Sequence, residues 1–287
     1  MVDNLETIPA PPMGWLGAPL LLAEMTTESV AELIAAGVAV ALVPLGSTEP
    51  HGPHLPLGTD ALLSDEVCRR AAKALRVKGR PAVVAPSVAY GVTRYAQGFH
   101  GVLSVSEPTL VSLLSEIGGA LLDDGFGRVA FVNNHLEPAH VSAIDRAATL
   151  IAEQRGPSCV SFPNQLTKRW GRTLTDEFKR GDCHAGRYET SLVLAARGEL
   201  VRRDLAQGLP SLTISLSDAI KNAKPGGSVT FGQIGMVRAY TGAPSEGTAV
   251  EGEDIYGRLV EMIVTEVTEH LEDAQDDTHP GEIPVGS

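Results

Sequence analysis

The sequence predicts an α/β protein with a mostly parallel central sheet and helices on both of its faces. Short, continuous apolar runs recur along the chain, and segments with helical apolar spacing separate them. Such runs are typical of strands buried on both faces, and an intervening helix lets successive strands pair in parallel. Apolar residues make up 43% of the 287 residues, and no internal repeat or linker divides them, so we expect one main domain.

The first strand is expected at residues 38–43, where VAVALV is uninterrupted by a polar side chain. A helix is predicted over residues 59–75, because apolar side chains recur there every four residues. The second strand is expected at residues 82–85. The next helix is predicted to start near Ser106 and Pro108, a capping residue followed by a helix-starting proline.

The second half of the chain continues the alternation. Strands are expected at residues 129–132 and 158–162, separated by a helix whose apolar face includes Ile144 and Ile151. Further helices are predicted around residues 189–196 and, as the last long element, residues 253–271.

Less regular segments frame this core. Residues 1–20 are expected to form an irregular arm, residues 21–273 a single catalytic domain and residues 274–287 a flexible tail. Residues 210–251 are rich in Gly, Pro and Ser and are expected to form a loop excursion near the site.

Composition narrows the classes of partner. The formal net charge of −12 does not favour nucleic acid, whose phosphates bind clustered Lys and Arg. The sequence shows neither an apolar run of the roughly 20 residues that a membrane span needs nor a signal-peptide pattern. Three scattered cysteines do not suggest a disulfide framework, so a cytoplasmic location is the expectation.

The most informative segment is GSTEPHGPHLPLGTD, residues 46–60, directly after the first predicted strand. It contains Glu49, His51, His54 and Asp60 within a stretch stiffened by three prolines. Metal ligands on a floppy loop would lose affinity to ordering entropy, whereas prolines restrict the chain and glycines permit its turns. For His54 a hydrogen-bonding role within the turn is favoured over a ligand role.

A second cluster, His135 and Glu137, follows the third predicted strand. Sites in open parallel sheets form beyond the carboxyl ends of strands, so both clusters are expected at one edge. Glu49 and His51, like His135 and Glu137, are two residues apart, and in extended chain such pairs point the same way. Mixed nitrogen and oxygen ligands suit Zn²⁺, Mn²⁺ or Fe²⁺, and Asp60 can bridge two ions.

A third cluster lies in DCHAGRYETS, residues 182–191, where His184 and Glu189 are the candidates. His184 is a plausible proton donor to a leaving group. The pocket-lining candidates are Cys183, Trp170, His100 and Tyr95, and for Trp170 the alternative is a partly buried aromatic that only packs. Cys183 is favoured as a small pocket residue over a nucleophile, because the sequence shows no base and orienting group for it.

These three segments resemble those of the creatininase family. GSTEPHGPHLPLGTD is similar to the family's first metal segment, NNHLEP to the second and HAGRYETS to the third, and the likeness covers about residues 22–270. The resemblance implies a three-layer α/β/α sandwich and a homo-oligomer, often a hexamer. It also implies two divalent ions in each subunit.

The resemblance further implies a ligand set. Glu49, Asp60 and His135 would hold one ion, and His51, Asp60 and Glu137 the other. His184 would protonate the departing nitrogen, and Glu137 is a candidate for handling the proton of the attacking water. Glu189 stays open between a ligand, a partner of the ligands and a mere neighbour.

We therefore expect a dinuclear metal amidohydrolase, in which a metal-bridged hydroxide attacks a small polar substrate. Its substrate would carry a cyclic amide, a formamide or a related C–N bond. Two alternatives use the same ions: hydrolysis of a ring ketone or ester-type bond, and cleavage of a short modified peptide. A third alternative, from another class, is a metal-binding scaffold without catalysis.

Overall fold

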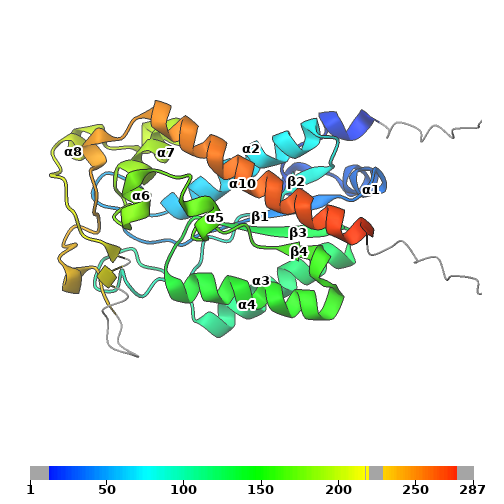
Figure 1. Cartoon of the computed structure of the whole chain (residues 1–287), viewed down its shortest axis with the longest axis horizontal. Coiled ribbons are helices and arrows are strands. Elements are labelled where there is room, and N and C mark those ends of the chain that lie inside the picture. Colours follow the sequence, from blue (N-terminus) through cyan, green and yellow to red (C-terminus); the bar gives the residue numbers. More distant parts are fainter. Residues whose placement is uncertain (1–12, 217, 220–228, 277–287) are drawn as a thin grey trace, which may run out of the picture.

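The computed structural model describes residues 13–216, 218–219 and 229–276 of the chain. Its strands form one sheet in the order β2-β1-β3-β4, and every neighbouring pair is parallel (Figure 1). The strands are β1 Val40–Leu45, β2 Ala82–Val84, β3 Arg128–Asn133 and β4 Val160–Ser161. The predicted mostly parallel sheet is confirmed.

Helices cover both faces of the sheet, which confirms the predicted layers (Figure 1). One face is covered by α2 Thr59–Val77, α7 Arg187–Arg197 and α10 Ala249–Asp276, the other by α3 Glu107–Asp123 and α4 Pro138–Arg155. The shorter helices are α1 Thr27–Ala35, α5 Lys168–Gly171, α6 Asp176–Arg180 and α8 Arg203–Gln207. The 3₁₀ helices are η1 Met13–Gly17, η2 Leu22–Glu24, η3 Pro157–Cys159, η4 Gly198–Leu200, η5 Gly232–Ile234 and η6 Pro244–Glu246.

Alternation along β3 explains why the sheet is apolar on both faces. Val129 and Phe131 pack in the core under α3 and α4, whereas Ala130 and Val132 pack in the core under α2, α7 and α10. Successive side chains of a strand point to opposite faces, so a strand between two helix layers must be apolar at every position.

The register of the central strands places the two metal-type segments side by side. Leu45, the last residue of β1, pairs with Asn133, the last residue of β3. The segments that follow them therefore leave the sheet at the same edge. The two segments are far apart in the sequence, but the parallel register of β1 and β3 brings them together in space.

The structure adds elements that the sequence pattern did not predict, namely α1 and the short helices α5, α6 and α8. Within residues 210–248, the described part is mostly irregular, as expected. Its exceptions are the helical residues 216, 218 and 219, the short turns η5 and η6 and a bridge between Leu212 and Gly242. In the described residues, no helix is both long enough and apolar enough to cross a membrane. Most of the predicted arm and tail, residues 1–12 and 277–287, lies outside the described residues.

Candidate metal centre

The segment after β1 folds back on itself beneath the edge of the sheet. A hydrogen bond connects the two ends of this segment, in which the Glu49 N–H donates to the Leu57 carbonyl at 3.0 Å. Gly46 lies so close to the start of α2 that a Cβ there would be 2.5 Å from the Ala61 nitrogen, and Gly52 has a φ of 63°. Both positions require glycine. The turn buries Glu49 and His51 almost completely.

The first ligand group consists of Glu49, Asp60 and His135, the set that the family resemblance implies for one ion. Nδ1 of His135 lies 3.0 Å from Oδ2 of Asp60 and 3.4 Å from Oε1 of Glu49. All three side chains are buried and come from two βα junctions. Their donor atoms therefore converge on one point.

The second ligand group consists of His51, Asp60 and Glu189. Nε2 of His51 lies 3.0 Å from Oδ1 of Asp60 and 3.5 Å from Oε2 of Glu189. Asp60 belongs to both groups and turns one carboxylate oxygen toward each. The family resemblance implies Glu137 for this second group and leaves the role of Glu189 open. In the structure Glu189, from the first turn of α7, lies in this group.

Glu137 occupies a different place in the same pocket. Its Oε2 accepts hydrogen bonds from the backbone N–H groups of Arg94, at 2.8 Å, and Tyr95, at 3.1 Å. Its Oε1 is buried and has no hydrogen-bond partner in the described part of the chain. Burial raises the pKa of Glu137 to about 7, a value suited to proton transfer near neutral pH.

Backbone carbonyl groups fix the orientation of three imidazoles. Nδ1 of His51 donates to the Glu49 carbonyl, Nε2 of His135 to the Val92 carbonyl and Nε2 of His184 to the Pro50 carbonyl, at 3.0, 2.8 and 3.0 Å. A carbonyl only accepts, so each bonded nitrogen carries the proton. The other nitrogen of each ring faces the carboxylates. This is the arrangement that metal-binding histidines need.

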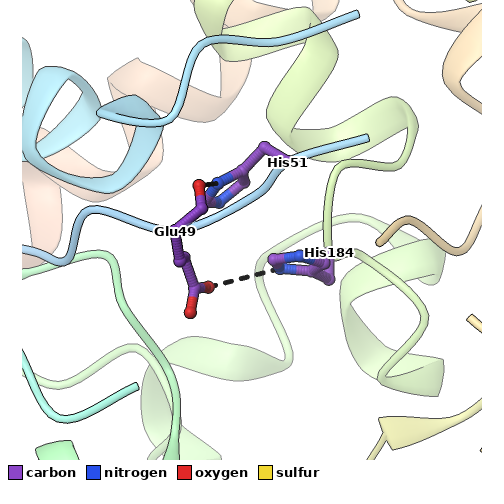
Figure 2. Close-up of side chains that lie close together, drawn as sticks. All are labelled: Glu49, His51 and His184. Atoms are coloured by element: carbon purple, nitrogen blue, oxygen red, sulfur yellow. Dashed lines mark hydrogen bonds and ion pairs between the residues drawn. The ribbon is translucent and has the colours of Figure 1, made fainter. Parts of the chain in front are cut away.

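His184 lies beside Glu49 and His51, and its Nδ1 is 3.8 Å from Oε1 of Glu49 (Figure 2). Glu49, His51 and His184 form a further group with converging donor atoms. Burial and the charge of His51 lower the pKa of His184 to about 4, so its imidazole is neutral at pH 7. In this state Nδ1 is a proton acceptor.

The protonation of the ligands reflects the close packing of acids and bases. Burial lowers the pKa of His51, but the carboxylates of Asp60 and Glu189 outweigh it and raise that pKa to about 10. The pKa of His135 is also raised well above its usual range, because Glu49 and Asp60 outweigh the effect of burial. Burial raises the pKa of Glu189 to about 8.

This donor set fits divalent metal ions. Burying several carboxylates in one place is costly unless cations balance their charge. The groups combine imidazole nitrogen with carboxylate oxygen and contain no thiol, which suits Zn²⁺ or Mn²⁺ with exchangeable positions. The shared Asp60 suits a pair of ions rather than a single one.

The pocket over the cluster has a cavity volume of about 110 Å³. Cys183 and Tyr95 line it, as do Phe231 and Leu216 from the irregular segment of residues 210–251. The predicted wall residues Trp170 and His100 are not brought to this pocket. Trp170 is buried elsewhere, where its indole N–H donates to Glu266 over 2.6 Å, and His100 is exposed.

Two further histidines, His54 and His140, form hydrogen bonds that hold the segments of the site together. Nε2 of His54 lies 2.9 Å from the Thr190 hydroxyl and so joins the first segment to α7. Nδ1 of His140 accepts from the Val92 N–H at 3.2 Å, and its Nε2 donates to the side-chain oxygen of Asn133 at 3.1 Å. Neither histidine belongs to a ligand group of the described residues.

The sequence pattern identified Tyr95 as a pocket-lining candidate, but it gave no role to the preceding residues 92–94, which follow β2. The Thr93 hydroxyl donates to Oε2 of Glu49, which leaves Oε1 facing His135. The same segment holds His135 through the Val92 carbonyl and Glu137 through two N–H groups. A signal was available, because this segment follows a predicted strand at the same edge as the two metal segments.

Comparisons with known proteins show the family to which the chain belongs. The family model of creatininase, described as creatinine amidohydrolase, matches residues 23–267. The "Mycofactocin precursor peptide peptidase" of Mycolicibacterium smegmatis is 33% identical over 227 residues, which cover 78% of this chain and 82% of the relative. The "Creatinine amidohydrolase" of Pseudomonas putida is 28% identical over 211 residues, covering 68% and 78%.

Among solved structures, one described as "Creatininase Mn" has a TM-score of 0.68 and 22% identity. The match covers 88% of this chain and 98% of that one, and it shows the shared fold. The members and relatives matched here are metal-dependent amidohydrolases and peptidases. The chain belongs to the creatininase family and is a hydrolase of that family.

Proposed function

We propose that this protein is a metal-dependent hydrolase that cleaves an amide bond of a short peptide. The observation that carries the proposal is the lining of the pocket. It combines the carboxylates and imidazoles of the candidate metal centre with apolar side chains. The apolar lining residues are Tyr95, Leu136, Leu166, Phe178, Leu216 and Phe231. Such walls suit an apolar side chain next to the scissile bond better than a small polar ring.

Two ions would be held by the two groups that share Asp60. Glu49 and His135 complete the first group, and His51 and Glu189 complete the second. Bound divalent ions would lower the pKa of a water molecule and polarise the carbonyl oxygen of the substrate.

The chain's own groups supply the proton transfers. Oε1 of Glu137, which is buried and free of hydrogen bonds in the described part of the chain, accepts the proton of the attacking water. Nδ1 of neutral His184 would then take up that proton from Glu137 through solvent and pass it to the leaving nitrogen as the C–N bond breaks. This relay retains the predicted donor role of His184, but only after the imidazole has gained a proton.

The similarity to known proteins supports a peptide as the substrate. A relative at 33% identity is named a precursor peptide peptidase, and the match covers most of both chains. The second candidate is a small cyclic amide or formamide, favoured by the 28% identity to a creatinine amidohydrolase. We rank the peptide first because of the apolar walls.

Turnover assays on metal-loaded protein separate the two candidates. The substrates are short peptides that carry either apolar or charged residues beside each bond, together with creatinine, lactams and formamides. We expect cleavage of peptides with an apolar residue at one side of the bond. Turnover of creatinine or a lactam without any peptide cleavage would overturn the peptide assignment and support the second candidate.

Leu166 offers a variant that tests the pocket itself, because it lines the pocket and its side chain is 48% exposed. L166E should raise the KM for apolar peptides and leave the metal content unchanged. L150E, at a 40% exposed position on α4, is the matched control. The homo-oligomer and the cytoplasmic location stay predictions. Light scattering would test the oligomeric state.

A further inference from the structure

We propose that Glu177, on α6, is a positioning residue. It fixes the turn that carries His184 and the start of α7, which carries Glu189. The proposal rests on the proposed function, because it assigns the support of the second ligand group. Glu177 belongs to none of the ligand groups of the described residues. It is nevertheless buried, with 6% of its surface exposed, although a carboxylate is seldom buried without partners that satisfy it.

The Glu177 carboxylate accepts three backbone hydrogen bonds. Oε2 accepts from the Tyr188 N–H at 2.6 Å, and Oε1 accepts from the N–H groups of Arg187 at 3.0 Å and Ala243 at 2.8 Å. Arg187 and Tyr188 are the first two residues of α7. One side chain therefore joins α6, the start of α7 and the segment before η6.

The start of α7 needs an acceptor from elsewhere in the chain. The first N–H groups of a helix have no partner within the helix, and a side chain at the N-cap usually accepts from one of them. The N-cap of α7 is Gly186, which has no side chain. A carboxylate at this end also interacts favourably with the helix dipole. Glu177 supplies both the acceptor and the charge.

The geometry around Glu177 is matched to a carboxylate. A Cβ on Gly186 would lie 2.8 Å from Oε2 of Glu177, and a Cβ on Gly242 would lie closer still to its Oε1. The two glycines thus leave the space that the carboxylate fills. An alanine at either position would displace it.

The turn that Glu177 supports carries reactive groups on both sides. Ala185, between His184 and Gly186, has a φ of 49°, a left-handed conformation that costs energy for a residue other than glycine. The Ala185 N–H donates to Oε2 of Glu189 at 2.6 Å, the oxygen that faces His51. Release of the helix start would free this turn and misplace Glu189 relative to His51.

The test compares E177Q with D176N in the full-length protein. The amide introduced by E177Q would offer only one acceptor oxygen to three N–H groups, whereas Asp176 is 83% exposed and lies on the same short helix. D176N therefore removes an equal charge one residue away. Two measurements are made: hydrogen exchange of the backbone amides, read by mass spectrometry, and competition titration of metal binding to each site.

We expect E177Q to speed hydrogen exchange across residues 184–190 while residues 46–60 keep wild-type exchange. We also expect E177Q to lower the affinity of the second ligand group for its ion by about tenfold or more. The affinity of the first ligand group should stay nearly unchanged. D176N should match wild type in both measurements. General destabilisation would instead affect both ions and both segments.

Wild-type exchange in residues 184–190 of E177Q, or an equal loss of both ions, would overturn the proposal. Faster exchange with unchanged affinity for the second ion would also overturn it. If wild-type protein bound no metal, the proposed function would fail, and the exchange comparison alone would decide whether Glu177 fixes the turn.

Discussion

Nε2 of His51 and Oδ1 of Asp60 lie 3.0 Å apart in a region where both side chains are almost fully buried. The other carboxylate oxygen of Asp60 faces His135 at the same distance. Asp60 therefore stands between two imidazoles from different βα junctions, and the two ligand groups meet in this one carboxylate. Loss of Asp60 should affect both ions together.

The first prediction concerns this shared carboxylate. D60N should reduce the bound metal from about two ions per chain to near none, because each group loses a charged ligand. Metal content measured by mass spectrometry after gel filtration tests this. D65N, on the same helix but outside the groups, is the control. Retention of one full equivalent in D60N would contradict a bridging role.

The second prediction concerns Thr93, whose hydroxyl donates to Glu49. T93V has nearly the same shape but lacks the donor, so Glu49 loses its fixed orientation. Partners of metal ligands typically contribute about 10–100-fold in affinity, and we expect about a tenfold loss at the first ion. T93S keeps the hydroxyl and should restore wild-type binding in a competition titration. Equal affinities of T93V and wild type would refute the role.

The third prediction separates binding from catalysis at His184. H184N should keep its metal and fold but lower kcat by about 10²–10⁴, the range for loss of a general acid–base group. The measurement combines metal content with rates on a substrate that has a poor leaving group. If H184N lost an ion, His184 would be a ligand, as its grouping with Glu49 and His51 allows.

The fourth prediction concerns protons displaced by metal. The raised pKa of His51, about 10, means that its imidazole is protonated in metal-free protein at pH 7. A metal ion and a proton compete for the same nitrogen, so binding should release protons and affinity should rise with pH. Calorimetric titrations in two buffers with different ionisation enthalpies measure this release. Equal heats in the two buffers would show that no proton leaves.

Much of the fold follows from local pattern. The apolar run that became β1 and the helical period of α2 depend on nearby residues, so the sequence predicts them to within a few positions. The first ligand group was predictable for a similar reason: Glu49, Asp60 and His135 follow strands whose carboxyl ends must share an edge. Short helices such as α6 were missed because a few residues carry no clear period.

The rest of the site depends on contacts between distant segments. Glu137 and Glu189 both have suitable chemistry and spacing, and only the fold shows that the N–H groups of Arg94 and Tyr95 hold Glu137 away from the second group. Trp170 was predicted as a pocket wall, but Glu266 on α10 binds its indole N–H elsewhere. Single-sequence patterns contain no information about such pairings.

The most direct measurement of the central claim is anomalous scattering from crystals of protein loaded with Zn²⁺ or Mn²⁺. We predict two peaks per chain, one among Glu49, Asp60 and His135 and one among His51, Asp60 and Glu189. A fully loaded protein with no anomalous peak at Asp60, or with its ions bound elsewhere, would contradict the account.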